Sequence, residues 1–153
     1  MASHYATIRW FASPGEDFAR GQYSRGHSWN FDGLTNVAAS ASPHIVPAPW
    51  SNAAAVDPEE AFVASAASCH MLFFLDFARR AGVVVTSYED EAEGLMEKGS
   101  DGKTRITRVT LRPRILYGDV APTQEMLDDL HHKAHEACFI ANSITSEIVI
   151  EPK

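Results

Sequence analysis

Basic residues are scarce in this chain of 153 residues: 13 Lys and Arg stand against 20 Asp and Glu, and the formal net charge is -7. No run of basic residues occurs in the sequence. Nucleic acids and anionic membranes are bound through clustered Lys and Arg. The composition therefore argues against either as the main partner of this protein.

Long apolar runs are also absent, because no stretch of about 20 residues, the length that crosses a bilayer, is apolar throughout. The N-terminal segment MASHYATIRW lacks the basic segment, apolar run and small-residue cleavage site that a secretory signal has. We therefore expect a soluble protein of the cytoplasm that does not associate with a membrane.

Cysteine is rare, with Cys69 and Cys138 as the two representatives. Two cysteines do not make the disulfide framework that stabilises small secreted domains. In a reducing compartment, a pair of thiols indicates redox chemistry or metal binding, although free cysteine is also a common small residue of protein cores. The count alone leaves these interpretations open.

The stretch 56–82, VDPEEAFVASAASCHMLFFLDFARRAG, predicts one buried helix around which the chain is organised. Asp57 can cap its N-terminus, Pro58 suits the first helical position, and Glu60 occupies the capping-box position. Gly82 marks its end. One apolar stripe is formed by Phe62, Ala66, Cys69, Phe73 and Phe77. Alanine and serine keep the first half slim, so another backbone can approach closely.

Segments with β-branched or alternating apolar residues predict strands on both sides of this helix. They cover residues 4–10, part of 18–31, a short stretch after 35, and then 83–92, 94–98, 104–116 and 143–151. A second helix opens at Thr123, and Cys138 lies at its end. The order β-β-β-α-β-β-β-α-β makes an α+β chain, and its length fits a single domain over residues 1–153.

The two cysteines form the first candidate site. A thiolate attacks an oxygen or sulfur electrophile, and a second thiol within reach resolves the product as a disulfide. The attacking thiol must be ionised, for which a nearby guanidinium is suited. Arg25 is the candidate, because it lies among aromatic residues of the segment 18–31. The spacing leaves open whether the two thiols meet.

Glu59 is the second candidate. It precedes Cys69 by ten residues, which is about 15 Å along a straight helix, so it cannot touch the cysteine of its own helix. Either the helix breaks in the Ala/Ser run, or Glu59 reaches the cysteine of an antiparallel copy in a partner subunit. A simpler alternative is that Glu59 and Glu60 both complement the helix N-terminus.

Histidines of the second predicted helix offer a third candidate. His131, His135 and Cys138 have a spacing that zinc ligands accept, and His132 lies beside them. No CxxC pair accompanies them, and a solvated helix face with histidines explains the pattern as well. We predict no metal and no other cofactor.

The chain resembles the OsmC/Ohr superfamily of osmotically inducible and organic hydroperoxide resistance proteins, which are thiol-dependent peroxidases. The resemblance rests on Asp57-Pro58-Glu59-Glu60 with Cys69 ten residues after the first glutamate, on the apolar helix that ends in Ala78-Arg79-Arg80-Ala81-Gly82, and on the late Cys138. It covers nearly the whole chain. Its most specific part is the glutamate-to-cysteine spacing together with the second cysteine.

The resemblance implies that Cys69 is the peroxidatic cysteine and Cys138 the resolving one, that Arg25 activates the thiolate, and that Glu59 holds the arginine. Arg20 offers a competing register for the arginine. The implied fold is an intertwined homodimer with the two long helices at its centre and the active sites at the subunit interface. The implied substrate is an organic hydroperoxide, and a cellular dithiol acts as reductant.

Two features depart from many hydroperoxidases of the superfamily. Phe139 follows Cys138, where many members have proline, and residues 42–50 form a proline-rich loop typical of a subgroup. This loop carries Ile45, Val46 and Trp50, so we expect it to fold over a groove or a partner. The alternative to peroxidase activity is a non-catalytic, small-molecule-binding or stress-response dimer on the same fold.

Overall fold

A computed structural model describes all 153 residues, which form two compact units, Met1–Ala61 and Phe62–Lys153. The element order is three strands, a long helix, four strands, a second helix and a last strand. The predicted α+β class with two unlike helices is therefore confirmed, with one strand more than expected. The single domain over residues 1–153 stays a prediction.

The N-terminal unit is built on a three-stranded antiparallel sheet in the order β1-β2-β3. Its strands are β1 (Ala6–Arg9), β2 (His27–Phe31) and β3 (Asn36–Ala39), and a 3-10 helix, η1 (Phe18–Arg20), lies between the first two. The proline-rich loop returns to this sheet, where the N–H of Ser40 donates to the carbonyl of Val56. This hydrogen bond fixes Val56 beside the end of β3, two residues before the long helix begins.

The long helix α1 (Pro58–Arg80) begins and ends where the sequence predicts. The N–H of Glu60 donates to Asp57 Oδ1 at 2.7 Å, and the N–H of Asp57 donates to Glu60 Oε2 at 3.1 Å. This reciprocal pair satisfies two of the free donors at the helix N-terminus. At the other end, Gly82 takes φ 76°, a left-handed conformation that suits glycine.

The C-terminal unit contains two sets of paired strands. Strands β4 (Val85–Asp90) and β7 (Pro113–Tyr117) pair antiparallel, whereas β5 (Glu93–Lys98), β6 (Thr104–Leu111) and β8 (Glu147–Ile150) form a sheet in which β6 and β8 are parallel. The predicted strand over 104–116 is thus two strands. Arg112 divides them because its N–H donates to the side chain of Asp90 at 2.7 Å, and the following Pro113 has no N–H to donate.

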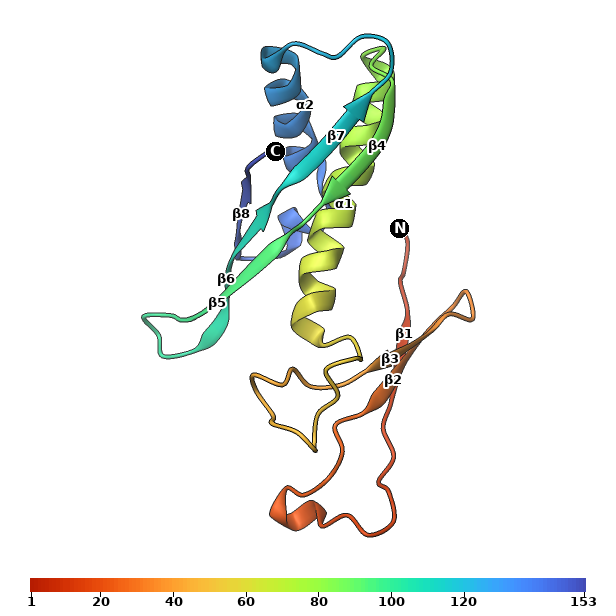
Figure 1. The fold of residues 1–153 in the computed structure, drawn as a ribbon, viewed down its shortest axis with the longest axis vertical. Helices are drawn as coiled ribbons and strands as arrows, with labels where there is room; N and C mark the ends of the chain where they lie inside the picture. Colours follow the sequence, from red (N-terminus) through yellow and green to blue (C-terminus); the bar gives the residue numbers. More distant parts are fainter. The chain divides into compact units, whose positions relative to one another are not determined.

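The second helix, α2 (Gln124–Ala137), is capped by Thr123, whose hydroxyl accepts from the N–H of Met126. A 3-10 turn, η2 (Ala141–Ser143), follows it. In Figure 1, α2 lies beside the C-terminal half of α1 and runs in the opposite direction. The buried side chains between the two helices are Phe74, Ala78, Leu130 and Ala134.

The sheet side of α1 forms a second buried cluster of Ala66, Val109 and Leu111. Helix and sheet approach closely here, because a Cβ added to Gly94 of β5 would lie 2.5 Å from Val63 Cγ2. By length and composition alone, α1 would pass as a membrane-spanning helix. In this fold its packing against α2 on one side and against the sheet on the other is that of a core helix.

Candidate functional site

The fold brings the two thiols close together, since Cys69 is one of the groups that raise the pKa of Cys138. Cys69 lies in the middle of α1 and is half-buried, whereas Cys138 directly follows α2 and is only 1% exposed. Neither is in a disulfide. Burial, and next to it the hydrogen bond with Cys69, raises the pKa of the Cys138 thiol. Cys138 is therefore a neutral buried thiol, and Cys69 is the sulfur that an incoming molecule can reach.

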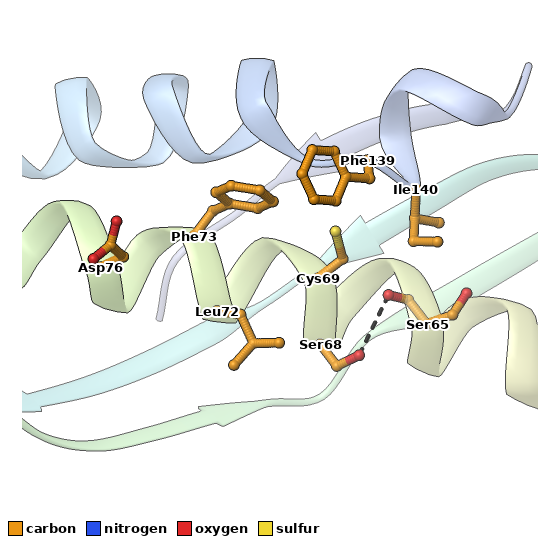
Figure 2. A pocket seen from close by; sticks show the side chains of 8 residues that line it. All are labelled: Ser65, Ser68, Cys69, Leu72, Phe73, Asp76, Phe139 and Ile140. Carbon is orange, nitrogen blue, oxygen red and sulfur yellow. Dashed lines mark hydrogen bonds between the residues drawn. The ribbon is translucent and has the colours of Figure 1, made fainter. Parts of the chain in front are cut away.

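Cys69 opens onto a groove of about 460 Å³ between α1 and the segment that follows α2 (Figure 2). Its lining consists of Ser65, Ser68, Cys69, Leu72, Phe73, Asp76, Phe139 and Ile140. The rings of Phe73 and Phe139 meet edge to face with their centroids 5.0 Å apart. Phe139 is nevertheless 72% exposed. The thiol thus stands in a mostly apolar groove that is open to solvent.

Small side chains keep this part of α1 narrow. The hydroxyl of Ser65 donates to the carbonyl of Phe62 at 2.8 Å, and that of Ser68 donates to the carbonyl of Ser65 at 3.3 Å. Because both hydroxyls are bonded to their own helix, they add little polarity to the groove. The charged group of the lining, Asp76, binds Arg79 and Arg80, and the hydrogen bond from Arg79 is the largest of the effects that lower the pKa of its carboxyl.

A pair of buried histidines joins α1 to α2 next to Cys69 in the sequence. His70 directly follows Cys69 on α1, and its Nε2 lies 3.0 Å from Nδ1 of His131 on α2. The two residues are 1% and 6% exposed, and their rings are parallel to within 8°. Burial lowers the pKa of His70 to about 4, with smaller effects of His131 and His135, and burial also lowers the pKa of His131 to about 4. Both imidazoles are therefore neutral near pH 7.

His70 is the residue of this site that the sequence predictions leave out. A single histidine among apolar helix residues has no spacing that marks it. The available signal is that an ionisable side chain on a helix predicted to be buried needs a polar partner. The partner comes from α2, and its identity depends on how the two helices pack.

The zinc arrangement considered for His131, His135 and Cys138 is not formed. His131 bonds to His70, and Cys138 contacts Cys69. No group of three or more His, Cys, Asp or Glu side chains has a geometry that could hold a metal ion.

Arg25 and Glu59 belong to the N-terminal unit, whereas Cys69 belongs to the C-terminal one, so the predicted meeting of these three residues stays a prediction. Arg25 lies in the loop before β2 and not on the strand expected from the sequence. The loop holds its side chain, since Nη1 donates to the carbonyl of Gly21 at 2.8 Å and the guanidinium lies 3.6 Å from the centre of the Tyr23 ring.

Arg20 and Glu60 are the neighbouring residues of the same charge as Arg25 and Glu59, and their side chains have other partners. Arg20 is bound only to Asp17 at 3.5 Å, and its side chain is 80% exposed. At the start of α1, Glu60 completes the capping box, which leaves the Glu59 carboxylate free of that task. Arg25 is therefore the ordered guanidinium of the two, and Glu59 takes no part in the capping box.

The histidine pair predicts acid sensitivity. In the unfolded chain both imidazoles bind a proton near pH 6.5, but in the folded protein only near pH 4. The unfolded state therefore binds more protons between these values, and the free energy of unfolding falls as the pH drops from about 6.5 to about 4, on the order of a few kcal/mol. The nearby Asp128 carboxylate weakens the effect at His131.

Urea titrations at pH 7, 5.5 and 4.5 measure this dependence. Replacing both residues, in His70→Leu/His131→Leu, should flatten the decline, whereas His132→Leu at the exposed neighbouring position should leave it as it is. An unchanged decline in the double variant would contradict the assignment.

Comparisons with known proteins agree with this geometry. The sequence model of the OsmC-like protein family matches residues 51–153. An OsmC-like protein of unknown function from Vibrio cholerae is 50% identical over 100% of both chains, with a TM-score of 0.97. The comparison with curated proteins gave no match.

More distant structures share the fold. The organic hydroperoxide resistance protein OhrB of Bacillus subtilis is 21% identical, with a TM-score of 0.68 over 99% of this chain and 98% of that one. A further organic hydroperoxide resistance protein, from Elizabethkingia anophelis, is 19% identical, with a TM-score of 0.70 over 99% and 94%.

Proposed function

This chain belongs to the OsmC-like family, and we propose that it is a thiol-dependent peroxidase that reduces organic hydroperoxides to alcohols. The observation that carries the proposal is the contact between Cys69, which faces an apolar groove, and the buried thiol of Cys138. An accessible sulfur next to a protected one is the arrangement that a two-cysteine peroxidase needs.

In the proposed reaction, the Cys69 thiolate attacks the distal oxygen of the hydroperoxide. The O–O bond breaks, the alkoxide takes a proton and leaves as the alcohol, and Cys69 becomes a sulfenic acid. The Cys138 thiol then attacks the sulfenic sulfur, which forms the disulfide and releases water. A cellular dithiol reduces this disulfide and returns both thiols.

The lining of the groove supports an organic substrate. Leu72, Phe73, Phe139 and Ile140 offer apolar surface to the alkyl or aryl part of a hydroperoxide. Hydrogen peroxide has no such part and gains nothing from this surface. The reactive oxygen would then lie against Cys69 while the organic group occupies the rest of the groove.

The charge that favours the Cys69 thiolate has to come from outside the histidine pair. His70 and His131 are neutral near pH 7, so neither supplies a cation. We assign this task to the Arg25 guanidinium, with Glu59 as the carboxylate that orients it. A positive group beside a cysteine favours the thiolate and is the usual means of activating it.

A homodimer accounts for the position of Glu59. It precedes Cys69 by ten residues on α1, about 15 Å along the helix, so its own cysteine is out of reach. An antiparallel copy of α1 would bring Glu59 and its arginine to the cysteine of the partner. We therefore place the active sites at the interface of a cytoplasmic homodimer.

The cysteine variants test the reaction itself. With cumene hydroperoxide and a dithiol, Cys69→Ser should abolish turnover. Without the dithiol, Cys138→Ser should consume about one equivalent of peroxide and then stop as the Cys69 sulfenic acid. In the native protein one equivalent should remove both thiols, with a Cys69–Cys138 link found by mass spectrometry. Retention of both thiols would instead indicate the non-catalytic binding dimer, and turnover by Cys69→Ser would exclude the mechanism.

The two arginines are separated by matched substitutions. Arg25→Met should slow the oxidation of Cys69 by about 100-fold, the usual effect of losing one charge-stabilising group. Arg20→Met should stay within about two-fold, because that side chain is bound only at the surface. Stopped-flow measurement of the first turnover gives both rates. The reverse ranking would assign the activating role to Arg20.

Mixing of subunits tests the shared site. Cys69→Ser alone should be inactive and Arg25→Met alone about 100-fold slow, and unfolding and refolding them together forms mixed dimers. In half of those dimers' sites an intact Cys69 meets an intact Arg25 of the partner, so the mixture should regain about a quarter of the native activity. No regain, or the mass of one chain in light scattering, would contradict a site built from two subunits.

A further inference from the structure

The contact between α1 and α2 contains one directional interaction. Phe74, Ala78, Leu130 and Ala134 form the buried apolar part of this interface. Apolar contacts are not directional, so they hold the two helices together without defining a single register. The bond between His70 Nε2 and His131 Nδ1, at 3.0 Å, is the only side-chain hydrogen bond between the two helices.

Separating the two imidazoles would be costly. The buried Nδ1 of His70 has no hydrogen-bond partner, so Nε2 makes the only bond of that ring. A shift of α2 would leave His131 Nδ1 unpaired as well, in a place that is closed to water. Because the pair is neutral, no charge repulsion opposes the contact near pH 7. The pair therefore favours one register of α2 on α1.

The same register controls the distance between the sulfurs. On α1, Cys69 directly precedes His70. Cys138 directly follows the last residue of α2 and comes seven residues after His131, close to two full helical turns. Cys138 therefore lies on the same side of α2 as His131. A slip of one residue moves a helix by about 1.5 Å along its axis, whereas a disulfide requires the two Cβ atoms within about 3.5–4.5 Å.

We propose that His70 and His131 are positioning residues for the thiol pair: their hydrogen bond fixes α2 on α1 so that Cys138 meets Cys69. The catalytic consequence rests on the proposed peroxidase function. The pair acts in the second step, in which Cys138 attacks the Cys69 sulfenic acid and water leaves. In the first step the peroxide reacts at the Cys69 sulfur and the Cys138 sulfur forms no bond, so this step depends far less on the register of α2 than the second step does.

Two conservative substitutions of His70 test the hydrogen bond. The amide nitrogen of glutamine reaches the position of the imidazole Nε2, whereas that of asparagine falls one methylene short. His70→Asn should slow formation of the Cys69–Cys138 disulfide by at least about 10-fold, since small displacements of reacting groups have large effects on rate. His70→Gln should stay within about three-fold of the native protein. His132→Asn, at an exposed position of α2, is the matched control.

The measurement separates the two steps. After one equivalent of cumene hydroperoxide, trapping of the sulfenic acid in the Cys138→Ser background follows the first step, and acid quench with mass spectrometry follows the disulfide. We expect the first step to change by less than about two-fold in every His70 variant. The proposal would be overturned if His70→Asn and His70→Gln formed the disulfide at the same rate, whether that rate is native or slower. It would also be overturned if the oxidation of Cys69 and the formation of the disulfide were slowed equally.

A second measurement does not need peroxidase activity. Titration with reduced and oxidised glutathione gives the equilibrium constant of the Cys69–Cys138 disulfide, which reports how well the fold brings the thiols together. His70→Asn should lower this constant by at least about 10-fold, and His70→Gln should restore it. If the His70 variants lose turnover but keep the native equilibrium constant of the disulfide, the positioning role is contradicted. If the native protein consumes no peroxide but the variants show the expected changes in this constant, only the peroxidase function is contradicted.

A double variant distinguishes position from stability. In His70→Leu/His131→Leu both nitrogens are replaced by apolar groups of similar size, so no buried group is left unpaired and the fold should keep most of its stability. Its disulfide should still form at least about 10-fold more slowly than in the native protein. Disulfide formation at the native rate in this folded variant would overturn the proposal, and this result remains available if His70→Asn does not fold.

Discussion

The packing of α2 against α1 determines what the rest of the molecule can do. It buries Phe74 and Leu130, pairs His70 with His131, and places the residue after α2 over the middle of α1. Without it Cys69 would be a single exposed thiol on a helix, because its partner comes from the other end of the C-terminal unit. The strands serve this contact by holding α1 from its other side through Ala66, Val109 and Leu111.

The two sulfurs differ in solvent exposure because their environments differ. Cys69 faces an apolar groove that is open to solvent, whereas burial keeps Cys138 protonated by raising its pKa. The imidazoles nearby carry no charge near pH 7, so they shape the site without activating it. We propose that the guanidinium that activates Cys69 comes from the N-terminal unit of the partner in a homodimer.

Local signals in the sequence were sufficient for the helices. The capping box of Asp57 and Glu60 and the cap at Thr123 depend on residues a few positions apart, and the structure has both. The sequence predicts one strand over 104–116, because the division into β6 and β7 depends on a hydrogen bond from Arg112 to the distant Asp90. Interactions of this length leave no periodic pattern in the sequence.

The site shows the same difference between local and distant information. The chemistry of thiols identifies Cys69 and Cys138 from the sequence, and the structure brings them close together. The strand expected at Arg25 is a loop, because the side chain bonds to the carbonyl of Gly21 and stacks on Tyr23. His70 could not be recognised, since its only hydrogen-bond partner is contributed by a helix about sixty residues later.

The close approach at Gly94 limits the directions in which α1 can move. The side chain of Val63 leaves no room for a methyl group at Gly94, so α1 cannot move closer to β5 at this point. Cys138 is held at its own end by the N–H of Ala141, 3.4 Å from Sγ, in a short turn that follows α2. The disulfide that we propose between Cys69 and Cys138 would therefore be accommodated by this turn and not by a shift of α1 toward the sheet.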